Sequence, residues 1–364
     1  MPSSAKVPPE ILHEIIESLC LHCGPSAAEE WHYVDEHRWG YEEDRRVSAL
    51  ASLCLTSKAM RNIATRHLYH CPPPEKWSLL ARTLITSPDK AQHVRDLRCG
   101  QFHWPKDEDL IPDEIRAYYR ERVEAYTPIV DAGEDFDRER FFRDYSLAAE
   151  VHGEGWKYHN DIVALDIVAS LCPKVERLQA TLGYFDTFLF CAQNSMTALK
   201  HVDFRHYDTE SGVHLKNIAA LFRAAPNITS MRLYALAMEN SGDDDDDVDD
   251  GDGEPIEDLK FTLRHVKTID TKHSAVGAGA LGAILRACPS LEALNYSAGG
   301  PCIGFCQFTA RQAKNMILQH AKNLESFQLD MTEDVWRDDE DDGGLDDAKE
   351  GLASRGIQFS YVRW

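Results

Sequence analysis

A unit that recurs four times along the chain constrains the fold more than any other feature of the sequence. In each copy an amphipathic helical pattern ends abruptly, and a short alternation of apolar and polar residues follows. The helical patterns cover 165–170, 218–223, 281–286 and 313–320, and the alternations cover 175–178, 228–233, 291–294 and 324–329. A period of 3.6 residues followed by a period of two predicts a helix and then a strand. Proline or Lys-Asn between them ends the helix. The pattern therefore predicts an α/β fold.

Further strand-like stretches extend this pattern to 94–98, 199–204, 266–270 and, after a helical pattern over 345–353, to 356–362. The spacings between successive first apolar residues are 24, 29, 38, 25 and 33 residues, counted over Val175, Leu199, Ile228, Val266, Leu291 and Leu324. This period and alternation resemble irregular leucine-rich repeats over roughly residues 90–364. The resemblance implies units that stack into a solenoid because no unit can bury its apolar face alone. An irregular two-layer α/β domain is the alternative.

The N-terminal segment has a different pattern, typical of a small helical unit. Its apolar positions, which follow one helix face, are Ile11, Leu12, Ile15, Ile16 and Leu19. The Pro-Pro-Glu sequence at 8–10 suits a first helical turn. A second helical pattern covers 50–68 and ends at the prolines 72–74. Since each buried Ile or Leu contributes only about 1.5–3 kcal/mol, so small a unit is expected to need a partner.

These residues carry a second resemblance. Residues 7–12 (VPPEIL), with Ile15, Ile16 and Leu19, resemble the opening of an F-box, and residues 50–61 (LASLCLTSKAMR), with His67-Leu68-Tyr69, resemble its second half in fungal F-box proteins. The resemblance implies a three-helix module that docks on the linker subunit of an SCF-type cullin–RING ubiquitin ligase. The residues that it assigns to docking are Pro8, Glu10, Ile11, Ile15, Leu19, Leu53, Leu55, Ser57, Lys58 and Met60. An ordinary helical hairpin is the alternative.

The predicted organisation follows from both resemblances. An F-box-like helical module is expected over 1–75, interrupted by a long insertion at 20–47. The leucine-rich-repeat-like domain is expected over 76–364, with a charged helical insertion at 105–150 and acidic loops at 239–258 and 333–347.

Net charge bears on partners. Of the formal net charge of -22, residues 239–258 contribute -12 and residues 333–347 contribute -8, so the remaining chain is nearly balanced. This excess of acid disfavours nucleic acid and anionic membranes as partners. Each acidic stretch is expected to be a solvated loop or, alternatively, an arm for a basic protein. Ten cysteines at irregular spacing suit a reducing compartment, so a cytoplasmic or nuclear location is expected.

Two motifs suggest chemistry. Residues 277–282 read G-x-G-x-x-G between a strand-like stretch and a helix, as in a dinucleotide-binding turn, but other copies of the unit lack these glycines. Cys20, Cys23, His32 and His37 have ligand types suited to structural zinc, with a middle spacer that is short for a zinc finger. A repeat turn and a loop are the preferred interpretations, and neither cofactor nor metal is expected.

The sequence thus predicts a non-catalytic adaptor, with no catalytic residue. The F-box-like helices would bind the linker subunit, and the surface formed by the strands would bind an unknown protein target, with Arg177, Arg232 and Gln328 as candidate contacts. A non-degradative scaffold or an acidic histone-type chaperone is the alternative, and a nucleotide-dependent enzyme ranks behind both.

Overall fold

The structure is a computed structural model of the whole chain. The residues that it describes are 8–24, 41–73, 77–99, 113–125, 165–182, 187–206, 212–238, 259, 261–299, 308–333 and 344–363. The chain falls into two compact units, Met1–Gln179 and Ala180–Trp364. The sequence prediction places its only boundary after residue 75, so the N-terminal unit extends well beyond the predicted helical module.

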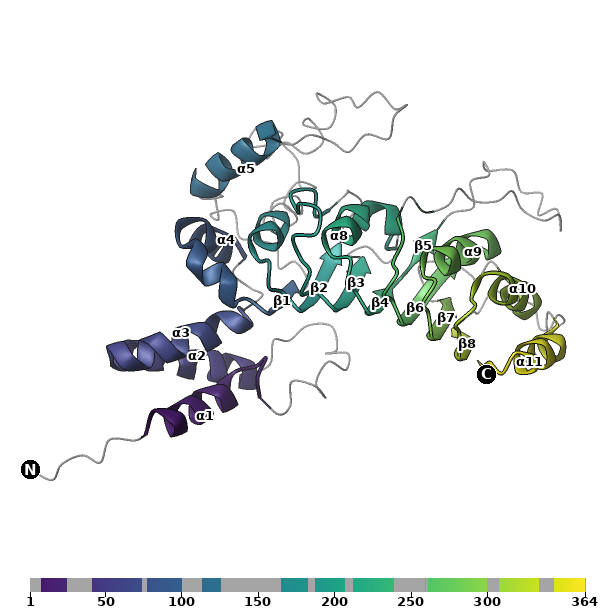
Figure 1. Cartoon of the computed structure of the whole chain (residues 1–364), viewed down its shortest axis with the longest axis horizontal. Coiled ribbons are helices and arrows are strands. Elements are labelled where there is room, and N and C mark those ends of the chain that lie inside the picture. The colour runs from purple at the N-terminus through teal and green to yellow at the C-terminus, as the bar shows by residue number, and fades with distance from the viewer. Residues whose placement is uncertain are drawn as a thin grey trace, which may run out of the picture. The chain divides into compact units, whose positions relative to one another are not determined.

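The N-terminal unit is mainly helical. Its elements are α1 (Pro9–Leu19), α2 (Tyr41–Thr56), α3 (Lys58–His70), α4 (Trp77–Thr86), the short 3-10 helix η3 (Pro88–His93), β1 (Asp96–Cys99) and α5 (Asp113–Ala125). Residues 165–171 are also helical. Helices α1, α2 and α3 lie beside one another (Figure 1). Helix α2 begins at Tyr41, so the last seven residues of the predicted insertion 20–47 are helical.

The second predicted helical pattern is divided at Ser57 into α2 and α3. Ser57 has an extended backbone (φ -159°, ψ 163°), and its hydroxyl accepts a hydrogen bond from the Met60 N–H at 3.1 Å. A serine in this position caps the first turn of a helix, because its side chain satisfies an N–H that has no partner within the helix. The local chemistry of Ser57 thus starts a third helix where apolar spacing alone suggests continuation.

The C-terminal unit alternates strands and helices. Its elements are β3 (His201–His206), η5 (Leu215–Ile218), α8 (Ala219–Ala224), β4 (Ser230–Tyr234), β5 (Ala237–Met238), β6 (Thr268–Val276), α9 (Ala278–Ala287), β7 (Ala293–Gly299), α10 (Ala310–His320), β8 (Ser326–Glu333), α11 (Leu345–Ser354) and β9 (Gln358–Val362). The division of the chain, between Gln179 and Ala180, falls within strand β2 (Arg177–Leu182). The predicted α/β class is confirmed.

One nine-stranded sheet has the order β1-β2-β3-β4-β6-β7-β8-β9, with β5 paired to β6. The pairings from β3 to β9 are parallel and largely in register, so that Val202 lies opposite Met231 and Met231 opposite Ile269. This row continues through Leu294 to Phe327, and all five side chains are buried. Helices α9, α10 and α11 lie in a row along one side of the strands (Figure 1). An apolar strand face covered by helices is the expected arrangement of a parallel sheet.

The repetition extends to individual hydrogen bonds. The carbonyl of Lys267, the residue before β6, accepts bonds from the N–H groups of Glu292 and Ala293 at 2.8 and 2.9 Å. The carbonyls of Arg95, Lys200, Thr229 and Glu292 accept equivalent pairs of bonds from the start of the next strand. The same arrangement, in which one carbonyl accepts from two N–H groups, therefore occurs five times between neighbouring strands of the described residues.

The charged and acidic segments are described in part. Helix α5 lies within the predicted charged helical insertion 105–150, whose other residues lie outside the described residues, as does the acidic stretch 239–258. The second acidic stretch is not simply a loop, since Glu333 ends β8 and residues 345–347 begin α11. There the Asp347 carboxylate lies 2.5 Å from Lys314 Nζ, and this hydrogen bond lowers the pKa of Asp347.

Candidate functional site

Helices α1, α2 and α3 enclose a small core of their own. Ile16, Leu50 and Ala64 are 1%, 1% and 0% exposed. The half-buried apolar residues that pack around them are Leu19, Leu53, Cys54, Met60, Ile63 and Leu68. Each helix contributes to this cluster, so the three helices are held together without using all of their apolar side chains.

Several apolar side chains of these helices point away from that core. Ile11 and Ile15 of α1 are 44% and 50% exposed, and Leu55 near the end of α2 is 80% exposed. Ile11 and Ile15 are four residues apart and share one face of α1. Among the described residues, the other large hydrophobic side chains with comparable exposure are only Leu79 and Val362. Three of these five exposed hydrophobic side chains thus lie on α1 and α2.

The ten residues that the F-box resemblance assigns to docking divide into two groups. Seven are exposed: Pro8, Glu10, Ile11, Ile15, Leu55, Ser57 and Lys58. Leu19, Leu53 and Met60 are half-buried against the core cluster. The hydroxyl of Ser57 is used in capping α3. A substitution of the half-buried group would disturb the packing of the module, whereas the exposed apolar residues can be changed without opening it.

The face of the sheet opposite the apolar rows carries polar side chains at matching positions. One row runs from Asp203 through Arg232, Asp270, Asn295 and Gln328 to Ser360. Asn295, Gln328 and Ser360 are exposed, whereas Arg232 is held by carboxylates on both sides. Arg232 Nε lies 3.4 Å from Asp270 Oδ2, and its Nη1 lies 3.8 Å from Asp203 Oδ2. The row is therefore a polar surface that is ion-paired at one end.

The three candidate target contacts lie in different environments. Gln328 is exposed on β8, and Arg232 is partly exposed on β4. The side chain of Arg177 is only 12% exposed, and its Nη2 lies 3.1 Å from Oδ2 of the fully buried Asp96. The expectation that Arg177 is an exposed contact is wrong, because its guanidinium neutralises a buried carboxylate.

Cys20, Cys23, His67 and His70 form a cluster that the sequence analysis missed. One ligand atom of each residue lies within 4.8 Å of those of the other three. His70 Nδ1 lies 3.4 Å from Cys20 Sγ and 3.3 Å from Cys23 Sγ. A hydrogen bond from Cys23 lowers the pKa of Cys20 despite burial, and the same bond raises the pKa of Cys23. His32 and His37, the histidines that the sequence analysis paired with these cysteines, lie outside the described residues.

The glycine motif at 277–282 lies at the start of α9, with Gly277 as the residue before its first turn. A Cβ atom at Gly282 would lie 3.0 Å from Met316 Sδ of α10. A buried glycine at this point lets α9 and α10 approach closely.

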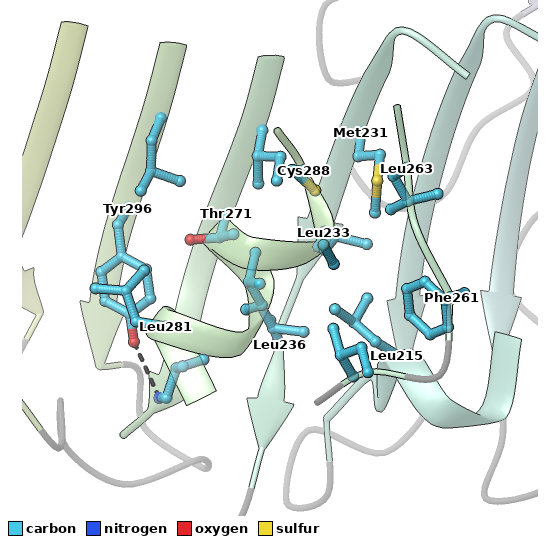
Figure 2. Close-up of a pocket in the computed structure, with 16 residues that line it drawn as sticks. Leu215, Met231, Leu233, Leu236, Phe261, Leu263, Thr271, Leu281, Cys288 and Tyr296 are labelled. Carbon is cyan, nitrogen blue, oxygen red and sulfur yellow. Dashed lines mark hydrogen bonds between the residues drawn. The ribbon is translucent and has the colours of Figure 1, made fainter. Parts of the chain in front are cut away.

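A cavity that Leu281 of this segment helps to line is small and apolar (Figure 2). Its volume is about 10 Å³, and its lining includes Leu233, Leu281 and Tyr296 from β4, α9 and β7. The Tyr296 hydroxyl accepts a hydrogen bond from the Val276 N–H at 3.1 Å and donates one to the Ser274 carbonyl at 3.0 Å. Because small-molecule sites usually measure several hundred Å³, this cavity is a packing gap in the core.

Comparison with known proteins adds no assignment. No protein-family model matches the chain, and no curated protein matches it. Within the ranges that the structure describes, none of the helices has the length and hydropathy needed to cross a bilayer.

Proposed function

We propose that the chain is a substrate-recognition adaptor of an SCF-type cullin–RING ubiquitin ligase. In this proposal α1, α2 and α3 form an F-box-like module that binds the linker subunit. The observation that carries it is the exposure of Ile11, Ile15 and Leu55 on helices whose core is already filled by other residues. These exposed residues belong to the set that the F-box resemblance assigns to docking.

The energetics favour a partner on this surface. Burying a fully exposed Ile or Leu side chain contributes about 1.5–3 kcal/mol. Covering the exposed parts of Ile11, Ile15 and Leu55 would contribute a fraction of this for each, which together favours association. Glu10 lies beside Ile11, and Lys58 begins α3 after Leu55. Exposed charges next to apolar anchors restrict the orientation in which a partner can dock.

The C-terminal unit would bind the protein to be ubiquitinated. We propose that its repeated units form a leucine-rich-repeat-like solenoid, and that the target contacts the polar face on which Asn295, Gln328 and Ser360 are exposed. The adaptor itself makes or breaks no bond. It raises the local concentration of the target near the ubiquitin-charged enzyme. This role implies a cytoplasmic or nuclear location.

Co-purification of the full chain with the linker subunit tests the docking proposal. The double variant Ile15→Asp/Leu55→Asp should lose the linker subunit while keeping the circular dichroism spectrum of the wild type. Leu79→Asp is the matched control, because Leu79 is also 50% exposed and lies on α4, outside the assigned docking set. Retention of the linker subunit by the double variant, or its equal loss from the control, would contradict the proposal.

The acidic-chaperone alternative makes a different prediction. Deletion of residues 242–253, which lie in the first acidic stretch, should leave linker binding and target binding unchanged if the chain is an adaptor. A histone-type chaperone would instead lose a basic protein partner on this deletion, and the loss would follow the salt dependence of exposed charges.

A further inference from the structure

We propose that Cys20, Cys23, His67 and His70 form a structural zinc site that joins the end of α1 to the end of α3. The four residues come from two short pairs with the same spacing, Cys-x2-Cys in the turn after α1 and His-x2-His in the last turn of α3. This inference does not depend on the proposed ligase function.

The distances fit a tetrahedral ion. Zinc–sulfur bonds of about 2.3 Å and zinc–nitrogen bonds of about 2.0–2.1 Å put neighbouring ligand atoms about 3.3–3.8 Å apart. His70 Nδ1 lies 3.4 Å from Cys20 Sγ and 3.3 Å from Cys23 Sγ. The remaining ligand-atom separations stay within 4.8 Å. Small side-chain adjustments are therefore enough for all four atoms to reach one ion.

The donor set selects the metal and the kind of site. Two thiolates and two imidazoles suit zinc and do not suit calcium or magnesium, which prefer oxygen ligands. Two thiolates also balance the charge of Zn²⁺. Since four protein ligands fill a tetrahedral shell, the ion has no free position for a substrate, and its role is structural.

A buried ring nitrogen of His67 is an independent observation in favour of an ion. The residue is 6% exposed, and its Nδ1 atom has no hydrogen-bond partner among the described residues. A buried polar atom without a partner costs stability. Coordination of an ion through one ring nitrogen fixes the tautomer of the ring and removes part of that cost.

His22 and Glu176 lie beside the cluster and contact one of its cysteines. His22 Nδ1 lies 3.6 Å from Cys23 Sγ, and His22 Nε2 lies 3.4 Å from Glu176 Oε2. Side chains that hydrogen-bond to metal ligands fix the orientation of those ligands, and His22, held by Glu176, is placed to do so for Cys23.

The proposed site also explains how α1 is held against α3 in the helical module. Ile16, Leu50 and Ala64 form only a small core, and Cys20 is separated from His67 by 47 residues. An ion held at both points ties the first helix to the third. Small units that cannot build a large core commonly rely on a metal in this way.

Metal analysis of the full-length chain, purified without chelator or added zinc, is the first test. We expect close to one zinc ion per chain by elemental analysis. Cobalt titrated into the metal-free chain should give the intense visible absorption of tetrahedral Co²⁺ and a sulfur-to-cobalt charge-transfer band. A wild-type chain that contains no zinc and gives only weak, octahedral-type cobalt absorption would overturn the proposal.

Two pairs of histidine variants identify the ligands. His67→Asn/His70→Asn should lose zinc, whereas His32→Asn/His37→Asn should keep it; the reverse result would overturn the proposed ligand set. Cys20→Ser/Cys23→Ser should abolish the charge-transfer band, and Cys54→Ser, a half-buried cysteine of α2 outside the cluster, should not. If a variant is unfolded, the cobalt spectrum of the wild type still decides between the outcomes.

Discussion

His70 Nδ1 lies 3.3 Å from Cys23 Sγ, although 47 residues separate them in the chain. If an ion links them, removing it should destabilise the N-terminal unit selectively. Bound ligand stabilises a folded state by about 4 kcal/mol when its free concentration is a thousandfold above its dissociation constant. We expect a strong chelator to lower the midpoint of one thermal transition by calorimetry and to leave that of the C-terminal unit unchanged. Cys20→Ser/Cys23→Ser should be insensitive to chelator, and an equal response of variant and wild type would contradict the prediction.

The strands show how far sequence patterns reach. Each predicted strand begins two residues before the observed one, as at Val266 before β6 and Leu291 before β7. Both residues are buried in turns, where the Val266 N–H binds the Leu263 carbonyl and the Leu291 N–H binds the Cys288 carbonyl. Apolar alternation detects burial and does not distinguish a buried turn residue from the first residue of a strand. The order of elements was therefore predictable, and their exact starts were not.

The Cys/His cluster shows what local patterns miss. Proximity along the chain pairs Cys20 and Cys23 with His32 and His37. The structure instead brings in His67 and His70, three residues apart on one helix. A second pair with the same spacing was the available signal, but only the packing of α1 against α3 brings the two pairs together. Long-range contacts of this kind are not encoded in spacing.

Substitution by alanine should cost much more stability at Ile16 than at Leu55. Ile16 is 1% exposed in the core of the helical module, and Leu55 is 80% exposed. Ile16→Ala should lower the free energy of unfolding by about 2–5 kcal/mol, because it leaves a cavity. Leu55→Ala should change it by less than about 0.5 kcal/mol, as surface substitutions do. Urea unfolding of the full chain, followed by hydrogen exchange of α1 and α2, measures both. Similar losses for the two variants would show that Leu55 has a structural role.

The buried Asp96 should contribute far more than an exposed ion pair of the same unit. Its Oδ2 atom lies 3.0 Å from Arg98 Nη2 and 3.1 Å from Arg177 Nη2, and its side chain is fully buried. Asp96→Asn leaves two largely buried guanidinium groups without a counter-charge, which should cost about 3–5 kcal/mol. The control is Glu114→Gln, which breaks the exposed pair with Arg82 and should cost about 0–1 kcal/mol. Denaturant midpoints compare the two, and equal losses would contradict the argument.

Ionisation of Asp203 should lower the stability of the C-terminal unit. Protonation of this carboxyl in mild acid should therefore favour the folded state. Burial raises the pKa of Asp203 above its ordinary value of 3.8, although Arg205, Arg232 and Lys272 oppose this effect and Asp270 adds to it. Because the folded state then binds the proton more tightly than the unfolded state, ionisation of Asp203 costs stability. That cost is fully present above the raised pKa, is relieved as the pH falls through it, and is absent below about 3.8.

Asp203→Asn removes this contribution and tests its sign. At neutral pH the variant should gain stability relative to wild type, and the gain should shrink as the pH falls toward 3.8. Each tenfold change in acid dissociation between the folded and unfolded states corresponds to about 1.4 kcal/mol. Urea unfolding at a series of pH values from about 4 to about 7 measures the difference, and carbon NMR of the Asp203 carboxyl gives its pKa directly. If the carboxyl titrates below 3.8, the ion pair with Arg232 outweighs burial, and Asp203→Asn should then lose stability throughout this range.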